Sequence, residues 1–211
     1  MPDREIPGSF YDSETQNKIL DTATELFALK GYGAVSMRDI AKIVGIKMSS
    51  IYYYYDGKEA LLDDVFKRFE RGYRHYFDWL TAMNKEAESF EEVMDIMFNS
   101  EFRDMRDPLS CLGMSLIIKE QHNHESARKL VFDLFYDFSV KRMKAYFDNL
   151  IEKSITPPTD TRMIAILFMF GVIAYNDIKV QEYAGIKPPI NSMEIFNDMR
   201  QMVTISLTHK N

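Results

Sequence analysis

The sequence has few of the residues that crosslink or interrupt a chain. Its 211 residues include a single cysteine, Cys111, together with nine glycines and seven prolines. One cysteine excludes both an internal disulfide and a zinc site built from several cysteines. A glycine-rich phosphate loop, a G-x-S-x-G elbow and an H-E-x-x-H pair are also missing from the sequence. We therefore expect neither an enzyme nor a bound metal or cofactor.

Long hydrophobic runs are absent as well. The longest uncharged apolar stretch, residues 163–175, has thirteen residues, whereas a helix needs roughly 20 to span a bilayer. We interpret this stretch as a buried helix. The first residues are acidic and contain no apolar segment of the kind found in secretory signals. These observations predict a soluble, cytoplasmic protein with no membrane partner.

Positive charge is in deficit overall but is concentrated in one segment. The formal net charge of the chain is −6. Residues 30–58 nevertheless carry five lysines or arginines against two aspartates, which gives this segment a net charge of +3. A short basic segment on an acidic body is typical of a small DNA-reading module beside a larger domain that does not bind DNA.

Apolar residues recur with the period of a helix through almost the whole chain. The sequence shows no internal repeat and no alternating segment long enough for a sheet. It therefore predicts an all-α fold of about nine helices. Their expected positions are 15–30, 36–44, 47–54, a long helix that begins at 58, 90–105, 108–121, 125–153, 160–183 and 192–208.

Residues 36–58 contain two short helices joined by a tight turn. Ser36 and Asp39 have the spacing of a capping box at the start of the first helix, and Gly45 has the backbone freedom that a sharp turn requires. Ile51 is spaced to pack inward on the first helix. This pattern predicts a helix-turn-helix, whose second helix enters the major groove of DNA. A plain corner of two packed helices is the alternative.

The run of four tyrosines at residues 52–55 favours the DNA-binding interpretation. Tyr54 and Tyr55 can belong to the core, whereas an exposed pair at Tyr52 and Tyr53 has no packing reason to exist. Hydroxyl groups, lysine ammonium groups and helix N-termini are the groups that bind phosphates. Arg38 can offer a bidentate contact to guanine. The residues expected to face outward from the second helix are Lys47, Met48, Ser49, Ser50 and Tyr53.

The segment from about residue 15 to residue 62 resembles the N-terminal domain of the TetR/AcrR transcriptional regulators. The matching residues are Gly31-Tyr32, Ser36, Ile40-Ala41, Gly45-Ile46-Lys47, Ile51-Tyr52-Tyr53-Tyr54-Tyr55 and Lys58-Glu59-Ala60-Leu61. The resemblance implies a helix-turn-helix domain over residues 1–57, with an ordered core from about residue 15. It implies a helical ligand-binding and dimerisation domain over residues 58–211.

The resemblance also implies a function and a set of DNA contacts. Members of this family are homodimers, most often repressors that a small molecule releases from a palindromic operator in double-stranded DNA. An activator of the same architecture, or a helical small-molecule-binding protein with a vestigial DNA-binding module, is the alternative. The implied contacts are Ser36, Tyr52 and Lys58 at phosphates, Tyr53 at a phosphate or a base edge, and Arg38, Met48, Ser49 and Ser50 at bases. Lys47 stands where serine or threonine is usual, which removes the side-chain cap of the reading helix and adds a charge.

The rest of the chain is rich in aromatic and methionine side chains, which could line a small-molecule cavity. For any one of them, a place in the ordinary core is the commoner role. The candidates are Tyr76, Trp79, Met97, Phe98, Phe102, Met114, Phe135 and Phe138. Asp95 and Glu101 lie near this set. A carboxylate that faces a pocket would favour a cationic ligand, whereas a solvated helix face is the simpler interpretation.

The helix expected at 160–183 is apolar on all sides between residues 163 and 175, so it must be covered on all sides. With the last helix it is expected to form a four-helix interface between two subunits, and a wholly internal core helix is the alternative. Two-fold symmetry suits a palindromic DNA site. The residues expected at this interface are Phe168, Gly171, Val172, Tyr175, Phe196, Met199 and Val203.

Overall fold

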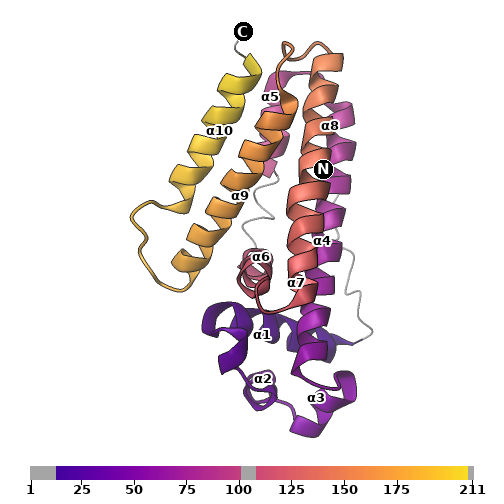
Figure 1. Ribbon diagram of the computed structural model, residues 1–211, viewed down its shortest axis with the longest axis vertical. Coiled ribbons are helices and arrows are strands. Elements are labelled where there is room, and N and C mark those ends of the chain that lie inside the picture. Colours follow the sequence, from indigo (N-terminus) through magenta and orange to yellow (C-terminus); the bar gives the residue numbers. More distant parts are fainter. Residues whose placement is uncertain (1–12, 101–107, 209–211) are drawn as a thin grey trace. The chain divides into compact units, whose positions relative to one another are not determined.

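The computed structural model describes residues 13–100 and 108–208, and every regular element in these ranges is a helix (Figure 1). By its internal contacts the chain divides into two compact units, Met1–Lys67 and Arg68–Asn211. We call them unit 1 and unit 2. The boundary between them falls inside helix α4 (Lys58–Glu86), which therefore contributes residues to both units. The expected functional division at residues 57 and 58 stays a prediction.

Unit 1 begins with helix α1 (Glu14–Lys30), whose first turn is capped by the Ser13 side chain. A short 3-10 turn, η1 (Tyr32–Ala34), leads to α2 (Met37–Val44) and α3 (Met48–Tyr54), and the start of α4 completes the unit. The apolar stripe predicted for the first helix is buried, which confirms the helical period read from the sequence. Its buried residues are Ile19, Leu20, Ala23, Leu26 and Phe27.

Unit 2 contains the remaining helices. They are the rest of α4, α5 (Phe90–Asp95), η2 (Ile96–Ser100), α6 (Pro108–Glu120), α7 (Glu125–Leu130), η3 (Val131–Phe138), α8 (Ser139–Glu152), α9 (Thr161–Tyr183) and α10 (Ser192–Thr208). The backbone stays helical where α5 passes into η2 and where α7 passes through η3 into α8. If α5 and η2 are counted as one helix, and α7, η3 and α8 as another, the described residues contain the nine predicted helices in addition to the short turn η1. The last part of the helix expected at 90–105 lies outside the described residues.

The sequence did not predict the π-type hydrogen bonding of η3. At its end the Ser139 hydroxyl donates to the carbonyl oxygen of Leu134, five residues earlier, at 2.5 Å. Since that hydrogen is used, the hydroxyl of Tyr73 donates to Ser139 Oγ at 2.8 Å. Burial raises the pKa of Tyr73, and the contact with Ser139 only partly opposes this effect. A side chain on α4 thus supports the wide turn of another helix.

Helices α9 and α10 lie side by side in unit 2 (Figure 1). A Cβ atom added to Gly171 on α9 would lie 2.6 Å from Met199 Cγ on α10, so the glycine permits this close approach. The Glu182 carboxylate accepts hydrogen bonds from the amide and the hydroxyl of Ser192, each at 2.7 Å, and so fixes the start of α10 to the end of α9. Partial burial raises the pKa of Glu182, but these bonds and Lys179 outweigh it, so the pKa lies below its ordinary value.

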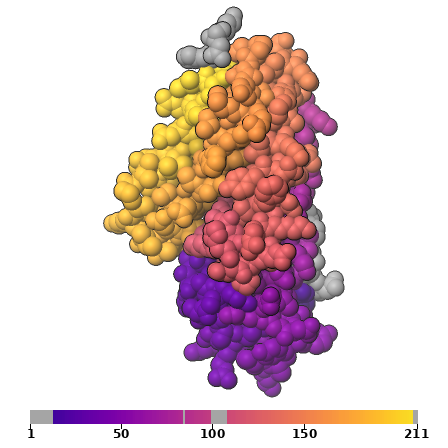
Figure 2. Space-filling model, in the orientation of Figure 1, coloured from indigo at the N-terminus to yellow at the C-terminus, as the bar shows by residue number. Residues whose placement is uncertain are grey.

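Helix α9 is long and apolar enough, by length and composition alone, to cross a membrane. Within the protein, 44% of its most apolar window is buried, and core helices pass the same test. Part of the outer surface of α9 and α10 is left uncovered by the rest of unit 2 (Figure 2). The predicted cytoplasmic location stays a prediction.

The contact between α9 and α10 can be tested with two glycines in helix interiors. Gly72→Ala on α4 adds a methyl group where nothing lies within 4 Å, so it should raise the free energy of unfolding by about 0.5–1 kcal/mol through helix propensity. Gly171→Ala has the same gain but must displace Met199, and it should be less stable than Gly72→Ala by about 1–3 kcal/mol. Urea unfolding of both variants measures the difference. Equal stabilities would contradict the close packing of α9 and α10.

Candidate nucleic-acid interface

Helix α2 begins with the capping box predicted from the sequence. Asp39 N donates to Ser36 Oγ at 3.2 Å, and Ser36 N donates to Asp39 Oδ2 at 2.9 Å. The Ser36 hydroxyl also donates to Asp39 Oδ2, at 2.5 Å. These bonds from the Ser36 side chain and backbone hold the pKa of Asp39 below its ordinary value. The hydrogen of the Ser36 hydroxyl is therefore already used within the protein.

The turn between α2 and α3 has the predicted geometry. Gly45 has a left-handed backbone, with φ 79° and ψ 30°, which glycine adopts without steric cost. The amides of Gly45 and Ile46 both donate to the carbonyl oxygen of Ala41, at 3.0 Å. Ile40, Ala41 and Ile51 are buried. The turn thus fixes two short helices against one apolar core, and their remaining faces stay in solvent.

Most residues expected at DNA are exposed on α2 and α3. Tyr53 has 83% of its surface exposed and Tyr52 has 46%. Lys47 occupies the N-cap of α3 without a side-chain hydrogen bond to the helix, as predicted. Ser50 is only partly exposed. We call the exposed set the candidate surface: Ser36, Arg38, Lys47, Met48, Ser49, Tyr52 and Tyr53.

The other two tyrosines hold α3 in place. Tyr54 accepts a hydrogen bond from the Ser13 hydroxyl at 3.2 Å. Tyr55 is buried; its hydroxyl donates to Asp64 Oδ2 at 3.1 Å and accepts from the Gln16 side chain at 3.4 Å. The first two tyrosines are in solvent, as the sequence predicted. Of the two expected in the core, Tyr55 is buried and Tyr54 is only partly buried.

Lys58, also expected at a phosphate, makes contacts within unit 1. Its ammonium group donates to the carbonyl oxygens of Tyr32 and Val35, at 2.8 and 2.9 Å. Its Nζ lies 4.2 Å from the centre of the Tyr32 ring. The Lys58 side chain is only partly exposed, whereas that of Lys47 is exposed. No local sequence signal predicts these contacts, because the partners lie more than 20 residues away along the chain.

The residues expected to line a ligand cavity are mostly packed in the core of unit 2. Met97, Phe98, Met114 and Phe135 are buried, Tyr76, Trp79 and Phe138 are partly exposed, and Phe102 lies outside the described residues. The aromatic members also fall into two groups. Phe98 packs edge-to-face on Phe168 and Phe196. Phe135 and Phe138 pack instead on aromatic rings of α4, namely Phe69, Tyr73 and Phe77.

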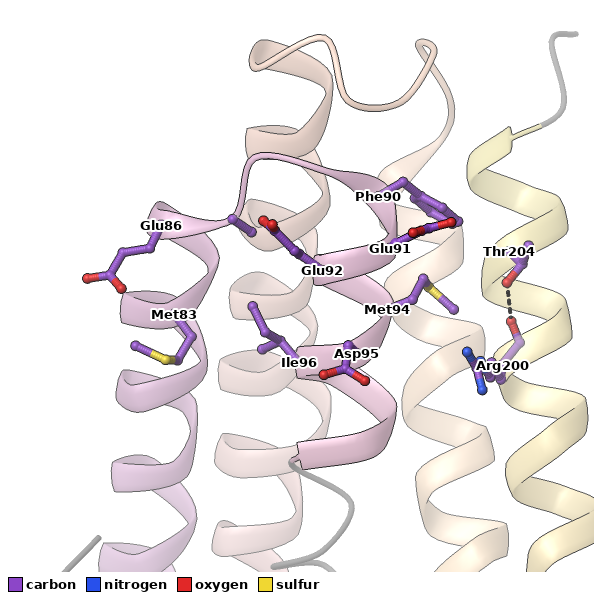
Figure 3. A pocket seen from close by; sticks show the side chains of 11 residues that line it. Met83, Glu86, Phe90, Glu91, Glu92, Met94, Asp95, Ile96, Arg200 and Thr204 are labelled. Atoms are coloured by element: carbon purple, nitrogen blue, oxygen red, sulfur yellow. Dashed lines mark hydrogen bonds between the residues drawn. The ribbon is translucent and has the colours of Figure 1, made fainter. Parts of the chain in front are cut away.

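An open groove of about 860 Å³ lies elsewhere in unit 2, along α5 and between the ends of α4 and α10 (Figure 3). It is lined by Met83, Glu86, Ala87, Phe90, Glu91, Glu92, Met94, Asp95, Ile96, Arg200 and Thr204. None of the aromatic and methionine residues expected to line a cavity is among them. Asp95, which the sequence places near that set, does line the groove. Four carboxylates against one arginine give the groove a negative balance. Glu92 Oε2 already accepts a hydrogen bond from Glu88 N at 2.8 Å. Glu101 lies outside the described residues.

The residues expected at a subunit interface are largely covered by their own chain. Six of them are buried in unit 2: Phe168, Val172, Tyr175, Phe196, Met199 and Val203. Gly171 is the remaining one, and it faces Met199 of the same chain. In its first half α9 exposes the large apolar side chains of Met163, Leu167 and Phe170, of which Phe170 is 55% exposed. These residues therefore pack within their own chain, because an all-apolar helix does not indicate which face turns inward. The interface between two subunits stays a prediction.

Comparison with known proteins shows what the chain is similar to. Residues 19–65 match the family model described as "Bacterial regulatory proteins, tetR family". The chain is 25% identical over 118 residues to the probable HTH-type transcriptional regulator YttP of Bacillus subtilis, an alignment that covers 56% of this chain and 49% of that protein. It is 33% identical over 87 residues to IcaR of Staphylococcus epidermidis, a negative regulator of the biofilm operon icaADBC, covering 41% and 45%. The chain thus spans about half the length of these relatives.

A solved structure supports the fold over almost the whole chain. The fatty acid degradation regulator FadR of Bacillus halodurans superposes with a TM-score of 0.69 at 18% identity, covering 95% of this chain and all of that one. At this identity the likeness concerns the fold alone. The relatives are named as transcriptional regulators rather than enzymes, in agreement with the expectation from the sequence.

The division of the tyrosine run can be tested by unfolding measurements. Tyr55→Phe removes a hydroxyl that bonds Asp64 and Gln16, so it should lower the free energy of unfolding by about 1 kcal/mol. Tyr53→Phe removes the same hydroxyl from an exposed ring and should stay within about 0.5 kcal/mol of wild type. Chemical denaturation of both variants decides this. Equal losses would mean that Tyr53 is also a structural residue.

Proposed function

We propose that the chain, whose residues 19–65 match the family model of the tetR bacterial regulatory proteins, is a ligand-responsive repressor that binds a palindromic operator as a homodimer. The observation that carries the proposal is the composition of the candidate surface. Two short helices bury Ile40, Ala41 and Ile51 and leave a guanidinium, an ammonium, two serine hydroxyls and two phenol groups in solvent. These are groups that bind the phosphates and base edges of DNA.

The chemistry of each residue suggests its role. Arg38 can read a guanine through a bidentate contact, while Lys47, Tyr52 and Tyr53 are suited to phosphates. Since the Ser36 hydroxyl donates to Asp39, its contribution to a phosphate is indirect: it holds the first turn of α2, where the amides of residues 37 and 38 have no partner within the helix. Those amides can donate hydrogen bonds to a phosphate oxygen at the positive end of the helix.

A second copy of the chain is the proposed cover for the exposed apolar stripe of α9. Met163, Leu167 and Phe170 follow one another at the spacing that places side chains on one face of a helix. All three are exposed in the single chain. An isologous contact through this stripe would relate two candidate surfaces by a two-fold axis, as a palindromic operator requires.

The proposed response to a ligand is a shift between conformations. An effector that binds better to the conformation unable to span both half-sites lowers the affinity for DNA, typically by 1–3 kcal/mol. The effector would bind in unit 2, and the groove along α5 is an open volume of suitable size there. Its negative balance would suit an apolar molecule that carries a positive charge. Transcription that rises on effector addition supports repression, and transcription that falls supports activation.

Binding to DNA can be measured by anisotropy with the duplex upstream of the protein's own gene, at two salt concentrations. Wild type should bind this duplex more tightly than random DNA, with an affinity that falls as salt rises. Lys47→Met should weaken binding to all sequences and reduce the salt slope by about 1, whereas Arg38→Ala should lose about 1–3 kcal/mol of discrimination between sequences. Equal affinity for both duplexes, or no dependence on salt, would contradict the proposal.

The dimer can be tested by placing a charge in the exposed stripe. Phe170→Asp should convert a particle of twice the chain mass into a single chain in light-scattering measurements, because a buried carboxylate would be left without a partner. Phe132→Asp changes another exposed aromatic residue, on η3, and should leave the mass unchanged. A dimer that survives Phe170→Asp but not Phe132→Asp would assign the interface to a different face.

A further inference from the structure

The ammonium group of Lys58 joins the first residue of α4 to the connection between α1 and α2. It donates to two backbone carbonyl oxygens in that connection, those of Tyr32 and Val35. Both distances are below 3 Å, and hydrogen bonds from a charged donor are about twice as strong as neutral ones. The face of the Tyr32 ring adds a favourable contact with the positive charge.

The partners of Lys58 are themselves fixed. The Tyr32 ring packs edge-to-face on Phe27 of α1, with ring centres 5.2 Å apart. Val35 is buried, and it directly precedes Ser36, the N-cap of α2. The lysine therefore holds the backbone at the point where α2 starts. The position of that start determines where Arg38 and the free amides of the first turn of α2 lie.

We propose that Lys58 is a positioning residue, which sets the place of the α2 N-terminus relative to the start of α4, and not a contact to a DNA phosphate. A lysine has three ammonium hydrogens, and two of them are used by the carbonyl oxygens. A phosphate contact would compete with these two bonds and with the Tyr32 ring. This inference rests on the proposed DNA-binding function and gives Lys58 a role there that differs from the one implied by the family resemblance.

The two roles predict different salt dependence. A phosphate contact releases a condensed counterion, so its loss reduces the slope of log affinity against log salt by about 0.9. A positioning residue has no such effect, although its loss weakens binding. The full-length protein is therefore titrated with its upstream duplex across a salt series, at a temperature where thermal scans show every variant folded.

Lys58→Met should weaken binding about tenfold and leave the salt slope unchanged, while Lys47→Met, the matched control on the candidate surface, should reduce the slope by about 1. Lys58→Arg keeps the charge and the donors and should bind within about threefold of wild type. A slope that falls in Lys58→Met as it does in Lys47→Met would overturn the inference. An unchanged affinity in Lys58→Met would overturn it as well.

Tyr32→Leu provides a second variant in case Lys58→Met does not fold. It removes the ring beside the ammonium group but keeps the lysine, so it should also weaken binding without changing the slope. A Tyr32→Leu protein with wild-type affinity would contradict the positioning role. Failure of the wild type to prefer its upstream duplex would instead overturn the proposed function, and the inference with it; wild-type binding measured first separates the two failures.

Discussion

The burial of Ile40, Ala41 and Ile51, on helices where α2 packs against both α1 and α3, is the constraint on which the rest of unit 1 depends. Helices as short as α2 and α3 are not stable alone in water, because a helix of this length cannot repay the cost of nucleation. Their shared apolar core makes them stable. The left-handed turn at Gly45 is what lets both helices reach that core. Once these three side chains point inward, helix geometry directs the serines, Arg38 and the first two tyrosines into solvent.

Polar contacts then fix the angles between these helices. The capping box at Ser36 defines where α2 begins, Tyr55 joins α3 to α1 and α4, and Lys58 joins α4 to the connection before α2. The capping box lies within the first turn of α2, whereas the bonds of Tyr55 and Lys58 lie between elements. A protein that must match the spacing of DNA grooves needs such fixed angles, since an error of about 1 Å in position is enough to lose a directed contact.

The sequence predicted the parts of the structure that local signals determine. The capping box, the glycine turn and the division of the tyrosines all follow from residues within a few positions of one another. The widened turn of η3 depends on Tyr73, which lies 66 residues from Ser139, and the contacts of Lys58 also depend on distant backbone. The sequence does not indicate which face of α9 is exposed, because that helix is apolar on every side between residues 163 and 175. The groove along α5 had no signal beyond Asp95.

The exposed residues of α2 and α3 are the proposed site at which this protein meets DNA. Backbone hydrogen exchange, followed with and without the upstream duplex, measures this contact directly along the chain. The account predicts slower exchange on DNA binding in peptides that cover residues 36–39 and 47–53. Unchanged exchange in both segments, with protection confined to other parts of the chain, would contradict it.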